Sequence, residues 1–424
     1  MSAVEEGRPE DSPLFEFELI YPRPGTKLII DQEPTGRSGH SMVADESNLY
    51  VLGGYNPLGR VLNLGRPTVL EELWQFNLAT RKWKKLECIG FPATCASSCM
   101  LLRGNNIYVF GGTSYPFGQF VSNAFKVCDI GNPQRDITGV HDKIYTWYNL
   151  LDGRSSPQGS STQDLNIPPF VFQDDENKPP KGYGQSVVFH GEYIYTFGGA
   201  VGFYNEAIAD MHRLSLVSLT WEKLEPSGEA PEGRYKQEII KDQDCFYIVG
   251  GGRLHAAQHV HILYSYSFLE NTWSKRVVPP DPVYGSPKPR NAFSLVQIDR
   301  DVYISGGQCY GMNSPPEILN DVWHLSLDTF RWTKLRVTLP ERMYFHRAVV
   351  SPAKHLYVYG GVLESSKRSH KIYRYRLPYQ TPELKELCWF VVSSRWRDLR
   401  RADPKELREK YGIPQCFVDR LPLS

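Results

Sequence analysis

The chain has 424 residues, with 48 lysines and arginines against 47 aspartates and glutamates, giving a formal net charge of +1. This balance provides no strong field toward nucleic acid or an anionic membrane, and no apolar run approaches the roughly 18 residues of a membrane-spanning helix. The aromatic share of 13% suits an all-β core that also exposes aromatic side chains.

The chain begins with an acidic, polar stretch. Residues 1–13 lack the apolar run of a secretory signal peptide, and we expect them to be disordered. The next segment, Phe15–Ile20, alternates apolar and polar residues, which predicts a β-strand.

Six Gly-Gly pairs then recur, each after a short apolar or aromatic run. They are Gly53-Gly54, Gly111-Gly112, Gly198-Gly199, Gly250-Gly251, Gly306-Gly307 and Gly360-Gly361. The apolar runs predict buried strands, and paired glycines allow a sharp turn where φ is positive and a Cβ has no room. A period of about 50 residues with these features is typical of kelch repeats in a β-propeller. We therefore predict an all-β, six-bladed kelch β-propeller over residues 14–380.

Two insertions interrupt the repeats. Residues 56–70 lengthen the loop after the first Gly-Gly pair. Residues 131–180 form a longer polar insertion, which we expect to be a partly disordered loop around a short strand near Ile144–Leu150.

The sixth repeat lacks a fourth strand. The earlier repeats each end with a tryptophan strand, whereas the chain after Tyr375 runs into Pro378 and Pro382. An open sheet edge favours aggregation, so the missing strand must come from elsewhere. Phe15–Ile20 is the predicted donor, and the ring would close by pairing the N-terminal strand with the last blade.

After Pro382 the apolar pattern becomes helical. Asp403, Pro404 and Glu406 match an N-cap, a proline at the first helical position and a capping acid. Residues 381–424 are therefore predicted to form a short helical segment behind the propeller.

Enzyme motifs are absent from the sequence, so we predict a non-catalytic protein without cofactor or metal. His255, His259 and His261 alternate on one strand face, but no nearby carboxylate or thiolate completes a metal site. The eight cysteines have no zinc-type spacing and favour a reducing compartment, which predicts a cytoplasmic or nuclear location.

Two sets of loops should converge on one face of the propeller, namely those after each Gly-Gly pair and those before each first strand. These loops carry an aromatic and arginine-rich set of candidate peptide-binding residues: Tyr183, Arg234, Tyr235, Arg253, Arg290, Asn291 and Tyr344. Arginine can hold a carboxylate through two parallel hydrogen bonds. Alternatively, some of these arginines only pair with loop acids such as Glu232.

The helical segment carries two short motifs. Leu384, Cys388 and Val392 are four residues apart and share a helix face, which resembles an elongin BC box. The later run resembles a cullin-2 box through Ile413, Pro414, Phe417 and Leu421. Apolar residues four apart are more often ordinary core, but the two motifs occur in order directly after a propeller.

Together these features resemble the elongin-dependent, kelch-type substrate receptors of cullin-2 ubiquitin ligases, over residues Gly36 to Leu421. The resemblance implies capture of a substrate's C-terminus, often glycine or another small residue, on the propeller face. It implies elongin B/C, cullin-2 and a RING subunit as partners, and it assigns the carboxylate to Arg253 and Asn291. The receptor would supply proximity and no chemistry.

Two other functions stay open at this point. A plain kelch scaffold in signalling or the cytoskeleton would use the helices only to cap the propeller. A propeller enzyme would need catalytic residues lining the channel, and the sequence offers none.

Overall fold

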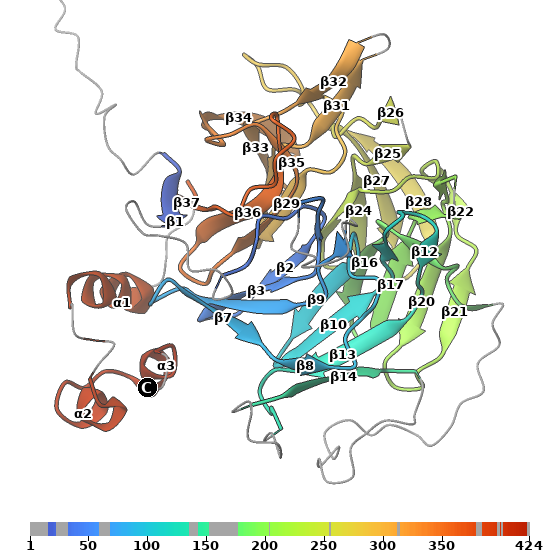
Figure 1. Cartoon of the computed structure of the whole chain (residues 1–424). Coiled ribbons are helices and arrows are strands. Elements are labelled where there is room, and N and C mark those ends of the chain that lie inside the picture. The colour runs from blue at the N-terminus through green and yellow to red at the C-terminus, as the bar shows by residue number, and fades with distance from the viewer. Residues whose placement is uncertain are drawn as a thin grey trace, which may run out of the picture.

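The structure, a computed structural model, describes residues 16–22, 33–58, 68–134, 143–151, 177–202, 204–253, 256–311, 314–378, 384–396, 399 and 402–421. Figure 1 shows its sheets arranged around a common centre, with the helices outside the ring at one side. The predicted disorder of residues 1–13 lies outside the described residues, as do residues 59–67, 135–142 and 152–176 of the two insertions.

Six sheets in the described part of the chain contain four antiparallel strands each, and in five of them the strands follow in sequence order from the centre outward. The first consists of β2 (Ser41–Ala44), β3 (Asn48–Leu52), β6 (Leu73–Asn77) and β7 (Lys82–Leu86). The second sheet consists of β9 (Cys99–Arg103), β10 (Asn106–Phe110), β13 (Phe125–Asp129) and β14 (Tyr145–Asn149), and the third of β16 (Ser186–His190), β17 (Tyr193–Phe197), β20 (Met211–Ser215) and β21 (Trp221–Leu224). The fourth consists of β23 (Glu238–Lys241), β24 (Cys245–Val249), β27 (Ile262–Ser267) and β28 (Thr272–Val277). The fifth consists of β29 (Ser294–Ile298), β30 (Asp301–Ser305), β33 (Asp321–Ser326) and β34 (Arg331–Thr338).

The last sheet joins the two ends of the propeller sequence. It contains β35 (Met343–Val350), β36 (His355–Leu363) and β37 (Ile372–Arg376), and its outer strand is β1 (Glu18–Tyr21). β1 runs antiparallel to β37 and buries Ile20 and Tyr21. The predicted closure by the N-terminal strand is confirmed, although the strand begins at Glu18 and reaches one residue beyond Ile20.

Short strands extend two of the sheets and form hairpins in the loops. β8 (Cys88–Ile89) and β22 (Ser227–Gly228) add parallel outer strands to the sheets of β14 and β28. The loop hairpins are β4 (Tyr55–Asn56) with β5 (Thr68–Val69), β11 (Thr113–Ser114) with β12 (Phe120–Val121), β15 (Gly182–Tyr183) with β18 (Ala200–Val201) and β19 (Glu206–Ala207), β25 (Gly252–Arg253) with β26 (Ala256–Ala257), and β31 (Gln308–Gly311) with β32 (Ser314–Ile318). β14 lies where a short strand was predicted within the insertion.

In the first five sheets the Gly-Gly pairs follow the end of the second strand, for the steric reason expected, whereas β36 continues through its pair to Leu363. Gly53 and Gly54 have φ of 63° and 95°. A Cβ at Gly53 would lie 2.2 Å from the carbonyl oxygen of Cys95 in the next repeat. Only glycine permits that approach of two backbones, so the pairs fix the contact between neighbouring sheets.

A closed circuit of backbone hydrogen bonds surrounds the centre of the ring. One residue per repeat, just before the innermost strand or, for Phe345, near the start of β35, has positive φ and donates its N–H to the preceding repeat. The bonds run from Gly39 to Phe345, Ser97 to Gly39, Gly184 to Ser97, Lys236 to Gly184, Ala292 to Lys236 and Phe345 to Ala292, at 2.7–3.4 Å. The innermost strands contact one another in the same cyclic order. The prediction of an all-β propeller is confirmed, and we call the surface around this circuit the ring face.

Three helices follow the last sheet: α1 (Leu384–Arg395), α2 (Pro404–Glu409) and α3 (Gln415–Val418). Asp403 caps α2, since its carboxylate accepts the backbone N–H of Lys405 at 2.8 Å, with Pro404 at the first position as predicted. The helices bury a small apolar cluster that includes Trp389, Leu407 and Phe417. No helix in the described residues is long and apolar enough to cross a membrane.

Candidate functional site

The two predicted loop sets meet on the ring face. Backbone bridges join the residue before each inner strand to the residue after a Gly-Gly pair: Ser38 to Tyr55, Ala96 to Thr113, Tyr183 to Ala200, Tyr235 to Gly252, Asn291 to Gln308 and Tyr344 to Val362. These pairings hold both sets of side chains on a rigid frame, which favours a preformed binding surface.

Aromatic side chains form much of that surface. The rings of Tyr183 and Tyr235 meet edge to face with centroids 5.9 Å apart, and both residues are buried. The ring of Tyr55 stacks on Tyr115 at 5.8 Å and meets Phe117 at 4.9 Å. Tyr115 and Phe117 are 42% and 40% exposed, so this second group forms an open apolar ledge.

Lys236 is the first of two ring-face cations that the sequence analysis did not select. Its Nζ lies 4.7 Å from the ring centre of Tyr235 and 4.5 Å from that of Phe345. Burial lowers the pKa of Lys236 to about 8. Among the described residues no carboxylate pairs with its ammonium group, and Glu238, two residues further on, pairs with Arg347. A desolvated cation without a counter-ion is a site for an anionic ligand.

Arg368 is a second cation that the sequence analysis did not select. Its Nη1 donates to the carbonyl oxygen of Ser366 at 2.7 Å, and its Nε donates to Ser38 Oγ at 3.3 Å. Its guanidinium lies 5.6 Å from the ring centre of Tyr55. Burial lowers the pKa of Arg368, with smaller opposing effects from Tyr344 and Tyr55. No acidic side chain in the described ranges pairs with it.

Arg234 and Arg290 do not reach the ring face, contrary to the prediction. Their side chains are buried, at 1% and 0% exposed. Arg234 donates to the carbonyl oxygens of Glu232 and Gly250, and Arg290 donates to Lys288 and Gly306 in the same way. Arg37 makes the equivalent contacts with Thr35 and Gly53. These arginines are struts that bind the first glycine of each pair, 16 residues further on.

Two struts also pair with acids. Arg290 makes two hydrogen bonds to Asp321, at 2.8 and 2.9 Å, and Arg37 pairs with Glu72. Burial alone would raise the pKa of Asp321, but the Arg290 guanidinium outweighs it and holds the pKa below its usual value. Because its guanidinium already makes these hydrogen bonds, Arg290 is not available to bind a ligand.

Arg253 differs from the struts, because its side chain is 57% exposed. Its Nη2 lies 3.8 Å from Glu232 Oε2, and its Nε donates to the Gly233 carbonyl oxygen at 3.3 Å. The acid pairing considered from the sequence is therefore present. Asn291 is buried at the same part of the face, and its Oδ1 has no hydrogen-bond partner among the described residues.

No metal site was predicted at the histidines that follow the fourth Gly-Gly pair. The described residues contain no group of three or more His, Cys, Asp or Glu side chains arranged to hold a metal ion. His255 lies outside the described residues, while the rings of His259 and His261 meet at 4.9 Å.

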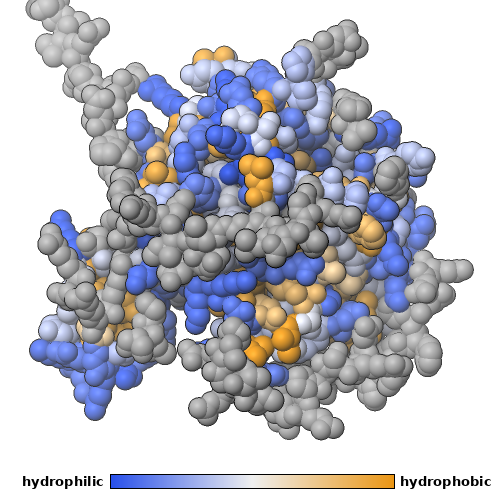
Figure 2. All heavy atoms as spheres, viewed as in Figure 1, coloured by the Kyte–Doolittle hydropathy of each residue, from blue (hydrophilic) through white to orange (hydrophobic). Residues whose placement is uncertain are grey.

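The outer face of α1 is apolar. Leu384 is 76% exposed, and Cys388 is exposed as well. Val392, the third predicted residue, instead packs against the inner cluster of the helices. Val391 is 48% exposed and continues the outer face, since positions 384, 388 and 391 share one side of a helix. Apolar, orange surface is visible on the helices in Figure 2.

The predicted cullin-binding residues likewise divide into exposed and buried positions. Pro414 is exposed and Ile413 half-buried. Phe417 and Leu421 are 5% and 8% exposed, and Phe417 stacks on Trp389 at 5.1 Å. Phe417 and Leu421 thus belong to the core of the helical unit, and their predicted role in choosing a cullin stays a prediction.

Comparison with family models shows which class of protein this chain belongs to. The family described as the KLHDC2/KLHL20/DRC7 Kelch-repeats domain matches residues 22–136 and 171–307, and the Kelch motif matches residues 289–336. The fold and these matches define a kelch-repeat β-propeller protein.

Individual relatives narrow the class. Kelch domain-containing protein 10 of Rattus norvegicus is 33% identical over 398 residues, covering 92% of this chain and 86% of the relative. The protein of Homo sapiens with that name is 34% identical and 80% covered. The chain therefore belongs to the Kelch domain-containing protein 10 family. Kelch domain-containing protein 2 of Bos taurus is more distant, at 23% identity over 333 residues.

Proposed function

We propose that this chain is the substrate-recognition subunit of a cullin-2 RING ubiquitin ligase. In this proposal the propeller binds the C-terminal end of a substrate, and the helices bind elongin B/C. Ubiquitination and proteasomal degradation of the substrate follow, and the chain itself performs no catalytic step. We propose further that the six sheets are all the blades of a closed ring, and that the protein works in the cytoplasm or nucleus.

The observation that carries the substrate half is the ammonium of Lys236, which has no acid partner in the part of the chain that the structure describes. A free C-terminus supplies a carboxylate at the end of a narrow chain, which fits a single cation between two aromatic rings. Arg368 would add a second positive charge beside Tyr55 and Tyr344. We assign the carboxylate to Lys236 and Arg368, with Arg253 and Asn291 at the next position along the face.

The apolar ledge supports recognition of the residues before the chain end. Tyr115 and Phe117 lie beside Tyr55, and the guanidinium of Arg368 borders the same ring. Rigid aromatic rings supply contact area at a low cost in conformational entropy. A peptide that includes the residues before the C-terminus is therefore a better probe than a free amino acid.

The ligase half of the proposal is supported by the outer stripe of α1. Leu384, Cys388 and Val391 present apolar surface to solvent on a helix whose inner face is already packed. An amphipathic helix with such a stripe is suited to a hydrophobic groove of a partner. The family resemblance implies elongin C as that partner, and we propose this contact.

Copurification of elongin B/C tests this half. Leu384→Ala with Cys388→Ala should abolish copurification, because truncating one anchor typically costs about 2 kcal/mol or more. Val217→Ala with Val277→Ala is a matched control, because these residues are 64% and 65% exposed on the propeller. Unchanged copurification from the α1 double variant would exclude this face as the contact.

A kelch scaffold without ligase function is the second candidate. The closed apolar core of the helical unit, centred on Trp389 and Phe417, favours it, because such a core would also suit a simple cap on the propeller. A scaffold would bind partners on the ring face but would bring no elongin C with it.

A further inference from the structure

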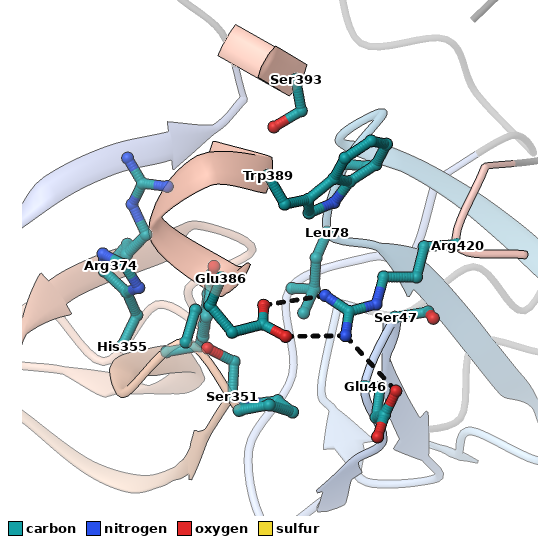
Figure 3. A pocket seen from close by; sticks show the side chains of 14 residues that line it. Glu46, Ser47, Leu78, Ser351, His355, Arg374, Glu386, Trp389, Ser393 and Arg420 are labelled. Atoms are coloured by element: carbon teal, nitrogen blue, oxygen red, sulfur yellow. Dashed lines mark hydrogen bonds and ion pairs between the residues drawn. The ribbon is translucent and has the colours of Figure 1, made fainter. Parts of the chain in front are cut away.

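A buried ion pair holds the helical unit together at its contact with the propeller. Arg420 Nη1 donates to Glu386 Oε2 at 2.8 Å, and Arg420 Nη2 donates to Glu386 Oε1 at 2.8 Å (Figure 3). Their side chains are 7% and 5% exposed. Two parallel hydrogen bonds fix the relative orientation of both groups as well as their separation.

Arg420 also connects the helices to the first sheet. Its Nη2 lies 3.3 Å from Glu46 Oε2, and its backbone carbonyl accepts from Asn77 Nδ2 at 2.9 Å. The guanidinium additionally lies 4.6 Å from the ring centre of Phe417 in α3. One side chain therefore touches α1, α3 and the propeller.

The helical unit rests across the seam where the propeller closes. A pocket at this contact is lined by residues of the first sheet and its turns, of the last sheet and its turns, and of the helices. Glu46 and Leu78 represent the first sheet, His355 and Arg374 the last sheet, and Glu386 and Trp389 the helices (Figure 3). The helical unit thus lies against both the first and the last sheet, which fixes the direction in which it points relative to the propeller.

The ion pair and the outer stripe belong to the same helix. Glu386 lies between Leu384 and Cys388 in sequence but points inward, where it is 5% exposed. Any rotation of α1 that breaks the pair must also redirect Leu384, Cys388 and Val391. The pair therefore couples the direction of the stripe to the propeller.

We propose that Glu386 and Arg420 are positioning residues, whose buried pair fixes the direction in which α1 presents its outer stripe relative to the ring face. The functional part of this inference rests on the proposed ligase role. Transfer to a bound substrate depends on orientation, so a swinging helical unit lowers the fraction of productive encounters even when both binding surfaces are intact.

A distance measurement tests the positioning directly. Spin labels at Arg395, the last residue of α1, and at the 92% exposed Leu269 of the propeller report the direction of the helical unit. The labels are introduced as unnatural amino acids, because the chain has eight cysteines. We expect one narrow distance distribution for the wild type, and a broad one for Arg420→Gln.

Three further variants sharpen the result. The exchange Glu386→Arg with Arg420→Glu should narrow the distribution again in part, because it restores the pair but places a carboxylate beside Glu46. The conservative Arg420→Lys should broaden the distribution partly, because it loses the paired hydrogen bonds. Lys410→Gln removes the exposed pair with Glu406 in α2 and should leave the distribution unchanged. A narrow distribution in both Arg420→Gln and Arg420→Lys would overturn the proposal. If Arg420→Gln does not fold, Arg420→Lys alone decides.

The consequence for transfer is measured on the same proteins. In a reconstituted reaction with a substrate bearing the recognised C-terminus, Arg420→Gln should slow ubiquitin transfer about tenfold while elongin C and peptide affinities stay unchanged. The exchange variant should recover part of the rate. A broad distance distribution with an unchanged rate would contradict the positioning role. A wild type that binds no elongin C would instead contradict the proposed function, and the distance result would still stand.

Discussion

The framework of the propeller and its ring face use the same positively charged residue types in opposite ways. In the framework, Arg37 and Arg290 are buried, pair with acids and donate to the carbonyls of the Gly-Gly turns. On the ring face, Lys236 and Arg368 have aromatic neighbours and no acid partner among the described residues. Satisfied charges hold the fold, and unsatisfied ones are available to a ligand.

This contrast predicts two kinds of mutational effect. Changes in the framework should lower the free energy of unfolding. Changes on the ring face should weaken binding without lowering the free energy of unfolding, because removing an unpaired, desolvated charge leaves no buried partner behind.

The largest expected effect comes from the closing seam. Deleting residues 1–22 removes β1 and with it the burial of Ile20 and Tyr21, and leaves β37 as an open edge. Burial of two such side chains contributes about 3–6 kcal/mol. Urea unfolding should show a midpoint lowered accordingly, and an unchanged midpoint would contradict closure by β1.

A strut should come next. Arg290→Leu leaves Asp321 partly buried without its partner and the Gly306 carbonyl without a donor, so we expect a loss of about 3 kcal/mol in unfolding free energy. Arg253→Leu is the matched control, since that arginine is 57% exposed and should change stability by less than about 0.5 kcal/mol. Equal losses from the two variants would erase the distinction between framework and face.

The smallest predicted effect concerns pH. Because burial lowers the pKa of Lys236 to about 8, the ammonium loses its proton between pH 7 and 9. The protonated fraction falls about tenfold over that range, and affinity for a carboxylate should fall with it. Burial raises the pKa of the neighbouring Tyr235 to about 12, so its phenol does not titrate there.

Folding stability should respond to Lys236 with the opposite sign. The lysine pKa is lower in the folded than in the unfolded chain, so the unfolded state binds more protons between about pH 8 and 10.5. The contribution of this group to the unfolding free energy therefore rises with pH in that window. Lys236→Gln should remove both trends in calorimetric titrations at several pH values, and a persisting affinity trend would assign it to another group.

The sequence predicted the features that depend on periodicity and backbone geometry. The Gly-Gly turns, the closing strand and the cap of α2 each follow from residues adjacent in sequence or from a missing repeat element. Local steric rules suffice for such features.

The sequence could not separate ligand-binding cations from struts. Arg234 stands beside Tyr235 in a surface-loop pattern, yet its guanidinium turns into the repeat and reaches Gly250. Lys236 follows in the next position, and its value as a site depends on Phe345 from two repeats later. Likewise, Val391 rather than Val392 faces outward, because packing against the helical cluster sets the rotation of α1. Such long-range contacts are absent from any local pattern.

The most direct test of the central claim is calorimetric binding of a glycine-ended peptide and its C-terminal amide to the wild type and to Lys236→Gln. For the wild type we predict that the free acid binds about 10–100-fold more tightly than the amide, since a charge-assisted hydrogen bond contributes about 1.5–3 kcal/mol. In Lys236→Gln the difference between acid and amide should shrink sharply. Equal affinity of the wild type for the two peptides would contradict the account.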